Sequence, residues 1–194
     1  MCEFEVTVAK EDFKFSCAHF IAYKGFRERL HGHNYRAYIK IVGSDTINDD
    51  GYVIDFGDIK KEVRALCKSV NEFFICPTKS EDMVITEAEG QICLQCEDGA
   101  RFSFPKSDCA MLPIYHSSAE ELAHWLWCCV VRKIGLEKMQ KRGLKALEVS
   151  VAEVPQQMAT FRCPVPATEQ ELQVIERRRM NKRPAGCLES SDAV

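Results

Sequence analysis

The sequence predicts an α+β fold in which helices pack on one face of an antiparallel sheet. Two observations carry this prediction: segments with the alternation of strands lie near both ends of the expected domain, and two amphipathic segments with helical spacing lie between them. With 194 residues, the chain is long enough to bury a sizeable core. We expect one domain over residues 1–166, followed by a charged, flexible C-terminal tail over 167–194.

The expected strands are segments rich in β-formers, most of them with alternating apolar and polar residues. They cover residues 3–20, 34–42, 91–96, 100–104, 146–154 and 158–163. Between the third and the fourth, Glu97-Asp98-Gly99 is a turn sequence. This pair therefore predicts a hairpin that is inserted into the core fold.

Two helices are predicted between the strands. The first begins near Asp55 or Gly57. The second follows Ser118, where a hydroxyl and the glutamate three residues later form a capping box. Their apolar stripes recur at helical spacing. These stripes are Ile59, Val63, Leu66, Val70 and Phe73 in the first, and Leu122, Trp125, Leu126, Cys129 and Val130 in the second.

Charge and composition exclude several classes of protein. The formal net charge is −3, which is not the basic excess of a nucleic-acid binder. No apolar run approaches the ~18 residues that a membrane span needs, and residues 1–4 contain neither a basic region nor an apolar signal core. The 11 cysteines cannot all pair within one chain, because their number is odd. Such abundant thiols indicate a reducing compartment. We therefore expect a cytoplasmic protein without a nucleic-acid or membrane partner.

Three of the five histidines fall in one short region. In a strand, His31 and His33 point to the same face, and Gly32 between them adds no side chain. His19, on the neighbouring expected strand, supplies a third imidazole. Three neutral ligands with one open position are typical of a catalytic zinc. The alternative is that these are surface histidines, or hydrogen-bonded core histidines, without a metal.

The surrounding motifs resemble the 6-pyruvoyltetrahydropterin synthase family over about residues 3–164. The motifs are Phe15-Ser16-Cys17-Ala18-His19-Phe20, Leu30-His31-Gly32-His33-Asn34-Tyr35, Gly51-Tyr52-Val53-Ile54-Asp55-Phe56, the run from His116 through Glu121, and Val151-Ala152-Glu153. The resemblance implies the T-fold, in which sheets of several subunits close into a β-barrel. It also implies a homohexamer with sites at subunit interfaces, and a Zn²⁺ ion held by the three histidines.

The same resemblance indicates the catalytic groups. The family usually has a cysteine before the His-Gly-His motif, whereas this chain has Arg27-Glu28 and resembles the glutamate-for-cysteine branch of protozoan parasites, called type III. Glu28 is then the general base. The usual Asp-His pair after the first helix is matched by Asn71-Glu72, which makes Glu72 a candidate acid. His116 is a candidate acid or phosphate contact.

The resemblance also indicates how a substrate is held. Glu153 matches the glutamate that binds the guanidine-like edge of the pterin, and Ser118 and Glu120 assist it. Three basic residues are candidates to meet a triphosphate: Lys24, Arg27 and Arg29.

The implied activity is that of a zinc-dependent lyase of 7,8-dihydroneopterin triphosphate. Its product is 6-hydroxymethyl-7,8-dihydropterin, for folate synthesis, or 6-pyruvoyl-5,6,7,8-tetrahydropterin, for tetrahydrobiopterin synthesis. One alternative is a weak or inactive pterin-binding homologue that lacks the proton relay. The other is a 6-carboxytetrahydropterin synthase.

Overall fold

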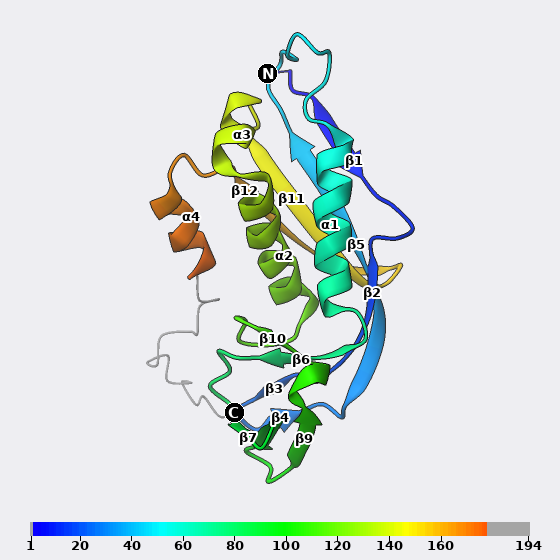
Figure 1. Ribbon diagram of the computed structural model, residues 1–194, viewed down its shortest axis with the longest axis vertical. Coiled ribbons are helices and arrows are strands. Elements are labelled where there is room, and N and C mark those ends of the chain that lie inside the picture. The colour runs from blue at the N-terminus through cyan, green and yellow to red at the C-terminus, as the bar shows by residue number, and fades with distance from the viewer. Residues whose placement is uncertain (1, 178–194) are drawn as a thin grey trace, which may run out of the picture.

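A seven-stranded sheet forms the frame of the protein, and two long helices lie across one of its faces (Figure 1). The computed structural model describes residues 2–177. The strands are paired in the order β10-β6-β2-β5-β11-β12, and β1 also pairs with β5. Their bounds are Glu5–Val8 (β1), Lys14–His19 (β2), His31–Val42 (β5), Phe73–Pro77 (β6), Cys109–Leu112 (β10), Ala146–Val154 (β11) and Gln157–Pro164 (β12). The α+β class and the helices on one face are therefore confirmed.

Strand β5 is the longest strand, with 12 residues, and it pairs antiparallel with β2 on one side and with β11 on the other. Four buried residues alternate along the strand and belong to the main core: Tyr35, Ala37, Ile39 and Ile41. Because successive side chains point to opposite faces, His31 and His33 share the face of Tyr35. The start of this strand therefore carries polar side chains on the face that is apolar farther along.

Both predicted helices are confirmed, as α1 (Phe56–Val70) and α2 (Ala119–Ile134). Asp55 caps α1 by accepting from the Gly57 N–H at 2.6 Å, and Ser118 caps α2 by accepting from the Glu121 N–H at 3.4 Å. A short helix, α3 (Leu136–Lys141), follows α2. Within residues 2–177, no helix is long and apolar enough to cross a membrane.

The sheet is mixed, which corrects the expectation of an antiparallel sheet. Strand β6 runs parallel to β2 and to β10. Phe73, expected on the apolar stripe of the first helix, begins β6, because α1 ends at Val70 and Glu72 adopts a φ of +67°. The backbone of Ser16 in β2 holds this turn: its N–H donates to the Asn71 side chain at 2.8 Å, and its carbonyl accepts from the Glu72 N–H at 2.6 Å. The helical spacing of apolar residues thus extends to Phe73, although the helix itself ends before the turn at Glu72.

The predicted hairpin is present, and one further strand joins it. The inserted sheet consists of β7 (Met83–Ala88), β8 (Gln91–Cys96) and β9 (Arg101–Pro105), and a short 3₁₀ helix (Lys106–Asp108) follows it. Phe102 and Phe104 dock it on the main sheet, with ring centroids 4.8 Å from Phe20 and 4.3 Å from Phe74. A two-stranded ribbon, β3 (Ala22–Tyr23) and β4 (Phe26–Arg27), lies at the same end of the molecule (Figure 1).

The first part of the expected tail is folded. Helix α4 (Glu169–Glu176) packs beside α2, and Leu172 is 1% exposed within the main core. Arg132 of α2 forms ion pairs with Glu169, at 2.8 Å, and with Glu176. Residues 167–177 therefore differ from the expectation of a flexible segment, while 178–194 lie outside the described residues.

Candidate active site

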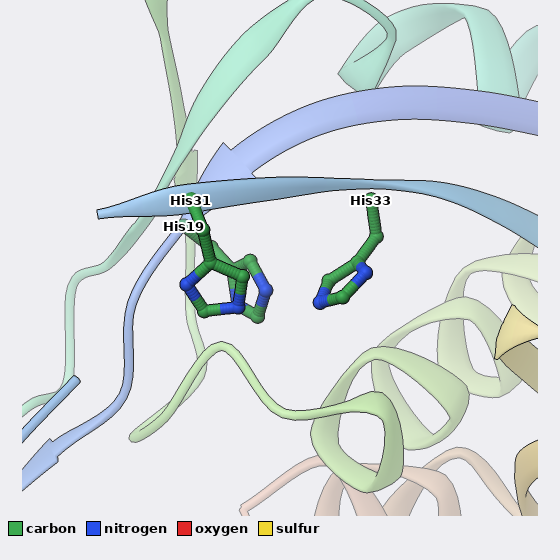
Figure 2. Close-up of side chains that lie close together, drawn as sticks. All are labelled: His19, His31 and His33. Atoms are coloured by element: carbon green, nitrogen blue, oxygen red, sulfur yellow. The ribbon is translucent and has the colours of Figure 1, made fainter. Parts of the chain in front are cut away.

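Three histidines meet where β2 ends and β5 begins. The antiparallel register places His19 directly opposite His31, and His33 lies two residues further along β5. One ligand nitrogen from each side chain lies within 4.8 Å of the other two. Figure 2 shows the three imidazoles on the same side of the two strands, above the loop that leads into α2. The structure thus brings together the three predicted metal ligands.

Backbone carbonyls orient two of these imidazoles. Nδ1 of His19 lies 2.9 Å from the Ser117 carbonyl, and Nδ1 of His31 lies 2.7 Å from the Arg29 carbonyl. An Nδ1–H that donates to a carbonyl leaves the lone pair of Nε2 available for a ligand bond. Burial, followed by the positive charge of His31 and His33, lowers the pKa of His19 to about 4. His19 is therefore neutral at physiological pH, which is the state that binds a metal, and the donor set fits a catalytic zinc.

Glu28 follows β4 and lies in the same pocket as the histidines. Its Oε2 accepts from the backbone N–H of Ile21 at 3.0 Å, and its own N–H donates to the Ile21 carbonyl at 2.9 Å. Two hydrogen bonds to one residue thus hold the side chain and the backbone of this half-buried glutamate. A carboxylate held in this way can accept a proton from a ligand in the pocket.

Glu153 enters the pocket from the far end of β11. The pairing of β11 with β12 shifts between Ala152 and Val154, and such a bulge re-aims the side chain at this point. The Tyr35 hydroxyl donates to Oε1 of Glu153 at 3.3 Å, while Oε2 lies 3.9 Å from Nε2 of His33. Tyr35 is not among the predicted site residues. Its place two residues after His33, on the same face, was the available signal.

A pocket of about 490 Å³ joins these groups. Its wall contains seven of the predicted site residues: His19, Glu28, His31, His33, Ser118, Glu120 and Glu153. Ser118 and Glu120 come from the start of α2, where Ser118 also caps the helix. Residues 156–159 complete the wall and had not been predicted. The pocket therefore combines imidazoles at one side with carboxylates from three separate elements.

Two predicted catalytic residues lie elsewhere in the described chain. Glu72 is exposed at the turn between α1 and β6, and it does not line the pocket. His116 is half-buried, with Nδ1 3.2 Å from the Ala22 carbonyl of β3, and it also lies outside the pocket wall. Neither lines this pocket in the described chain, and their catalytic roles stay predictions.

The basic residues before the His-Gly-His motif also differ from the expectation. The Nε of Arg27 donates to Oδ2 of Asp98 at 2.8 Å, and its guanidinium lies 5.5 Å from the centre of the Phe102 ring. Lys24 and Arg29 are exposed, and none of the three basic residues lines the pocket. Arg27 is therefore bound to the inserted sheet.

Cys17 is the thiol nearest to the histidines in sequence, and it faces the core. It is 4% exposed, and burial, reinforced by the charge of Glu153, raises its pKa to about 12. A thiol at this position stays protonated and is a poor nucleophile.

Comparison with known proteins shows the family of this chain. A sequence model of the family described as 6-pyruvoyl tetrahydropterin synthase matches residues 7–164. A Methanocaldococcus jannaschii protein with the provisional name 6-carboxy-5,6,7,8-tetrahydropterin synthase is 28% identical over 149 residues, which cover 77% of this chain and 89% of the relative.

Solved structures agree with the family match. The 6-pyruvoyl tetrahydropterin synthase of Plasmodium vivax is 41% identical, with a TM-score of 0.82 over 85% of this chain and 100% of that one. The Plasmodium falciparum enzyme is 39% identical, with a TM-score of 0.81 over 84% and 99%. Structures also exist of P. vivax variants in which a catalytic residue, a glutamate, is replaced by alanine or cysteine. The chain belongs to the 6-pyruvoyl tetrahydropterin synthase family of pterin lyases and has their T-fold.

Proposed function

We propose that this protein is a zinc-dependent lyase that converts 7,8-dihydroneopterin triphosphate into 6-hydroxymethyl-7,8-dihydropterin. The observation that carries the proposal is the single pocket in which Glu28 and Glu153 face three histidines. The P. vivax relative, which has a glutamate as a catalytic residue, supports a carboxylate base in this chain.

The metal ligands of this proposal are His19, His31 and His33. Three imidazoles leave one coordination position open, as in catalytic zinc sites. When bound, the zinc ion supplies Lewis-acid polarisation of the oxygens of the substrate side chain. The backbone contacts at Nδ1 of His19 and His31 fix the ring orientations and favour this ligand set.

Two carboxylates of the chain have separate roles, one in binding the substrate and one in removing a proton. Glu153 accepts two parallel N–H bonds from the guanidine-like edge of the pterin, and Ser118 and Glu120 assist in holding it. Glu28 takes the proton of the C2′ hydroxyl, and the C1′–C2′ bond then breaks. The electron pair remains on C1′, which takes up a proton to become the hydroxymethyl group. C2′ leaves as the aldehyde of the fragment that carries the triphosphate.

Other outcomes remain as second candidates, each on its own observation. The names of the Plasmodium relatives favour 6-pyruvoyl-5,6,7,8-tetrahydropterin as a product, and that of the archaeal relative favours 6-carboxytetrahydropterin. The exposed position of Glu72, outside the pocket, favours a weak or inactive pterin-binding homologue.

We also propose a homohexamer whose sheets close into a barrel. Strands β10 and β12 are the outer strands of the sheet and each pairs on one side only in the described chain, which supports this assembly. The ten described cysteines are free, which supports a reducing, cytoplasmic location. Native mass spectrometry tests the subunit number.

The decisive experiment is to incubate the purified protein with 7,8-dihydroneopterin triphosphate and to separate the pterin products. We expect 6-hydroxymethyl-7,8-dihydropterin from the wild type and a large loss of turnover in Glu28→Ala. A wild-type rate no greater than that of Glu28→Ala would contradict the proposal. Tight pterin binding without turnover would instead identify the inactive homologue.

A further inference from the structure

The turn of the inserted hairpin reaches the segment that carries Glu28. Asp98, at the turn between β8 and β9, accepts from Nε of Arg27 at 2.8 Å. Its neighbour Glu97 accepts from the backbone N–H of Gly25 at 2.8 Å. The ribbon of β3 and β4 is thus fixed at two points by residues more than 70 positions later in the chain.

Arg27 also contacts the backbone of Glu28. Its Nη1 donates to the Glu28 carbonyl at 2.9 Å, while its Nε is bound to Asp98. The guanidinium also lies over the ring of Phe102, 5.5 Å from its centre. One planar side chain therefore connects the inserted sheet to the backbone of Glu28.

The ribbon needs such support because it is small. Strands β3 and β4 have two residues each, and an isolated two-stranded ribbon is marginally stable in water. Gly25, at its turn, has a φ of +80°, and Tyr23 and Phe26 are about half exposed. Of its four strand residues only Ala22 is buried, at 4% exposed, so the ribbon has little burial of its own. Apart from its two hydrogen bonds to Ile21, Glu28 therefore depends on the contacts of the ribbon for its position.

We propose that Asp98 is a positioning residue that holds Glu28 in the pocket through Arg27, with Glu97 as a second point of attachment. The inference rests on the proposed function, in which Glu28 is the base. Oδ2 of Asp98 accepts from Arg27, and Oδ1 accepts from the Ala100 N–H at 3.0 Å, so both oxygens of the carboxylate are fixed. The inserted sheet thereby becomes part of the catalytic apparatus without touching the ligand.

The contact contributes more to placement than to stability. The side chains of Arg27 and Asp98 are 21% and 46% exposed, and ion pairs of this kind add little to folding. Displacement of a catalytic group by about 1 Å, in contrast, lowers a rate by as much as about 100-fold. Loss of the contact is therefore expected to appear in kcat before it appears in the unfolding free energy.

The variant Asp98→Asn tests this role. Its amide oxygen can still accept from the Ala100 N–H, while its NH₂ group faces the Arg27 donor. We expect kcat to fall by about 10- to 100-fold, with the pterin KM within about threefold of the wild-type value because Glu153 is untouched. Zinc content stays unchanged, and amide hydrogen exchange over residues 21–28 becomes faster.

Glu87→Gln is the matched control. It makes the same change in an ion pair of the same inserted sheet, where Lys106 lies 2.7 Å from Glu87 and both side chains are about half exposed. Wild-type kcat and exchange are expected for this variant. A second test is the double variant Asp98→Asn with Glu28→Gln, which is expected to be no slower than Glu28→Gln alone, because Asp98 acts through Glu28.

The outcomes separate this inference from the proposed function. If Asp98→Asn keeps wild-type kcat and exchange while Glu28→Gln is inactive, Asp98 does not position Glu28 and the proposed function stands. If Asp98→Asn loses zinc, or if its KM rises as much as its kcat falls, the role is generally structural and the inference is wrong. If Glu28→Gln itself is fully active, the assignment of the base fails, and the positioning role fails with it.

Discussion

The Tyr35 hydroxyl lies 3.3 Å from Oε1 of Glu153 and joins the histidine cluster to the carboxylate opposite it. The hydroxyl oxygen of Tyr35 also lies 3.0 Å from Nε2 of His19. The Tyr35 ring is buried and stacks on Phe15, with centroids 5.0 Å apart, so the hydroxyl is held in place by packing. One side chain of β5 thus contacts both a proposed metal ligand and the proposed pterin anchor.

Tyr35→Phe is expected to weaken pterin binding while the fold is kept. The phenylalanine ring retains the stacking on Phe15, and Glu153 loses one donor, which costs about 1 kcal/mol, or roughly fivefold in Kd. Calorimetric titration with a dihydropterin measures this change. Tyr38→Phe is the control because residue 38 lies on the opposite face of β5. Equal affinities of the two variants would show that the hydroxyl of Tyr35 does not support Glu153.

His33→Gln is expected to abolish tight zinc binding. Two imidazoles hold zinc much less firmly than three, so a metal analysis after gel filtration should find about one zinc per wild-type chain and far less in the variant. Zinc at about 100 times its Kd should stabilise the wild type by about 2.7 kcal/mol against unfolding. Wild-type zinc content in His33→Gln would exclude this residue as a ligand.

The zinc-free protein is expected to lose stability as the pH falls from about 6.5 to about 4. Burial beside His31 and His33 lowers the pKa of folded His19 to about 4, whereas the unfolded chain titrates near 6.5. Between these values the unfolded state binds the additional proton, so the free energy of unfolding decreases with decreasing pH. Urea midpoints across this window measure the effect. His19→Gln should have a shallower dependence, and an unchanged slope would contradict the assignment.

Leu172→Ala is expected to destabilise the protein by about 2–4 kcal/mol because it opens a cavity beneath α4. Leu172 is 1% exposed, whereas Val174 on the same helix is 69% exposed. Val174→Ala is therefore the control, with an expected change below about 0.5 kcal/mol. Urea denaturation measures both. Similar small effects would mean that α4 does not stabilise the domain.

Local periodicity explains why much of the fold was predictable. The stripe from Ile59 to Val70 and the cap at Ser118 are properties of neighbouring residues, and both helices follow from them. Strand β6 was not predictable in this way. Its first residue, Phe73, continues the helical spacing, and the turn at Glu72 depends on hydrogen bonds to Ser16, which is more than 50 residues away.

The same distinction holds for the pocket. The sequence by itself determined that His31 and His33 share a face, because the side chains of a strand alternate, and the structure places His19 beside them. Only the tertiary structure decided that Glu28 and Glu153 face these imidazoles while Glu72 does not.

Only the tertiary structure also decided that Arg27 is bound to Asp98. The bulge before Val154 and the docking of the inserted sheet set these contacts. Contacts between distant segments depend on register, loop closure and packing. A local sequence pattern encodes none of these three.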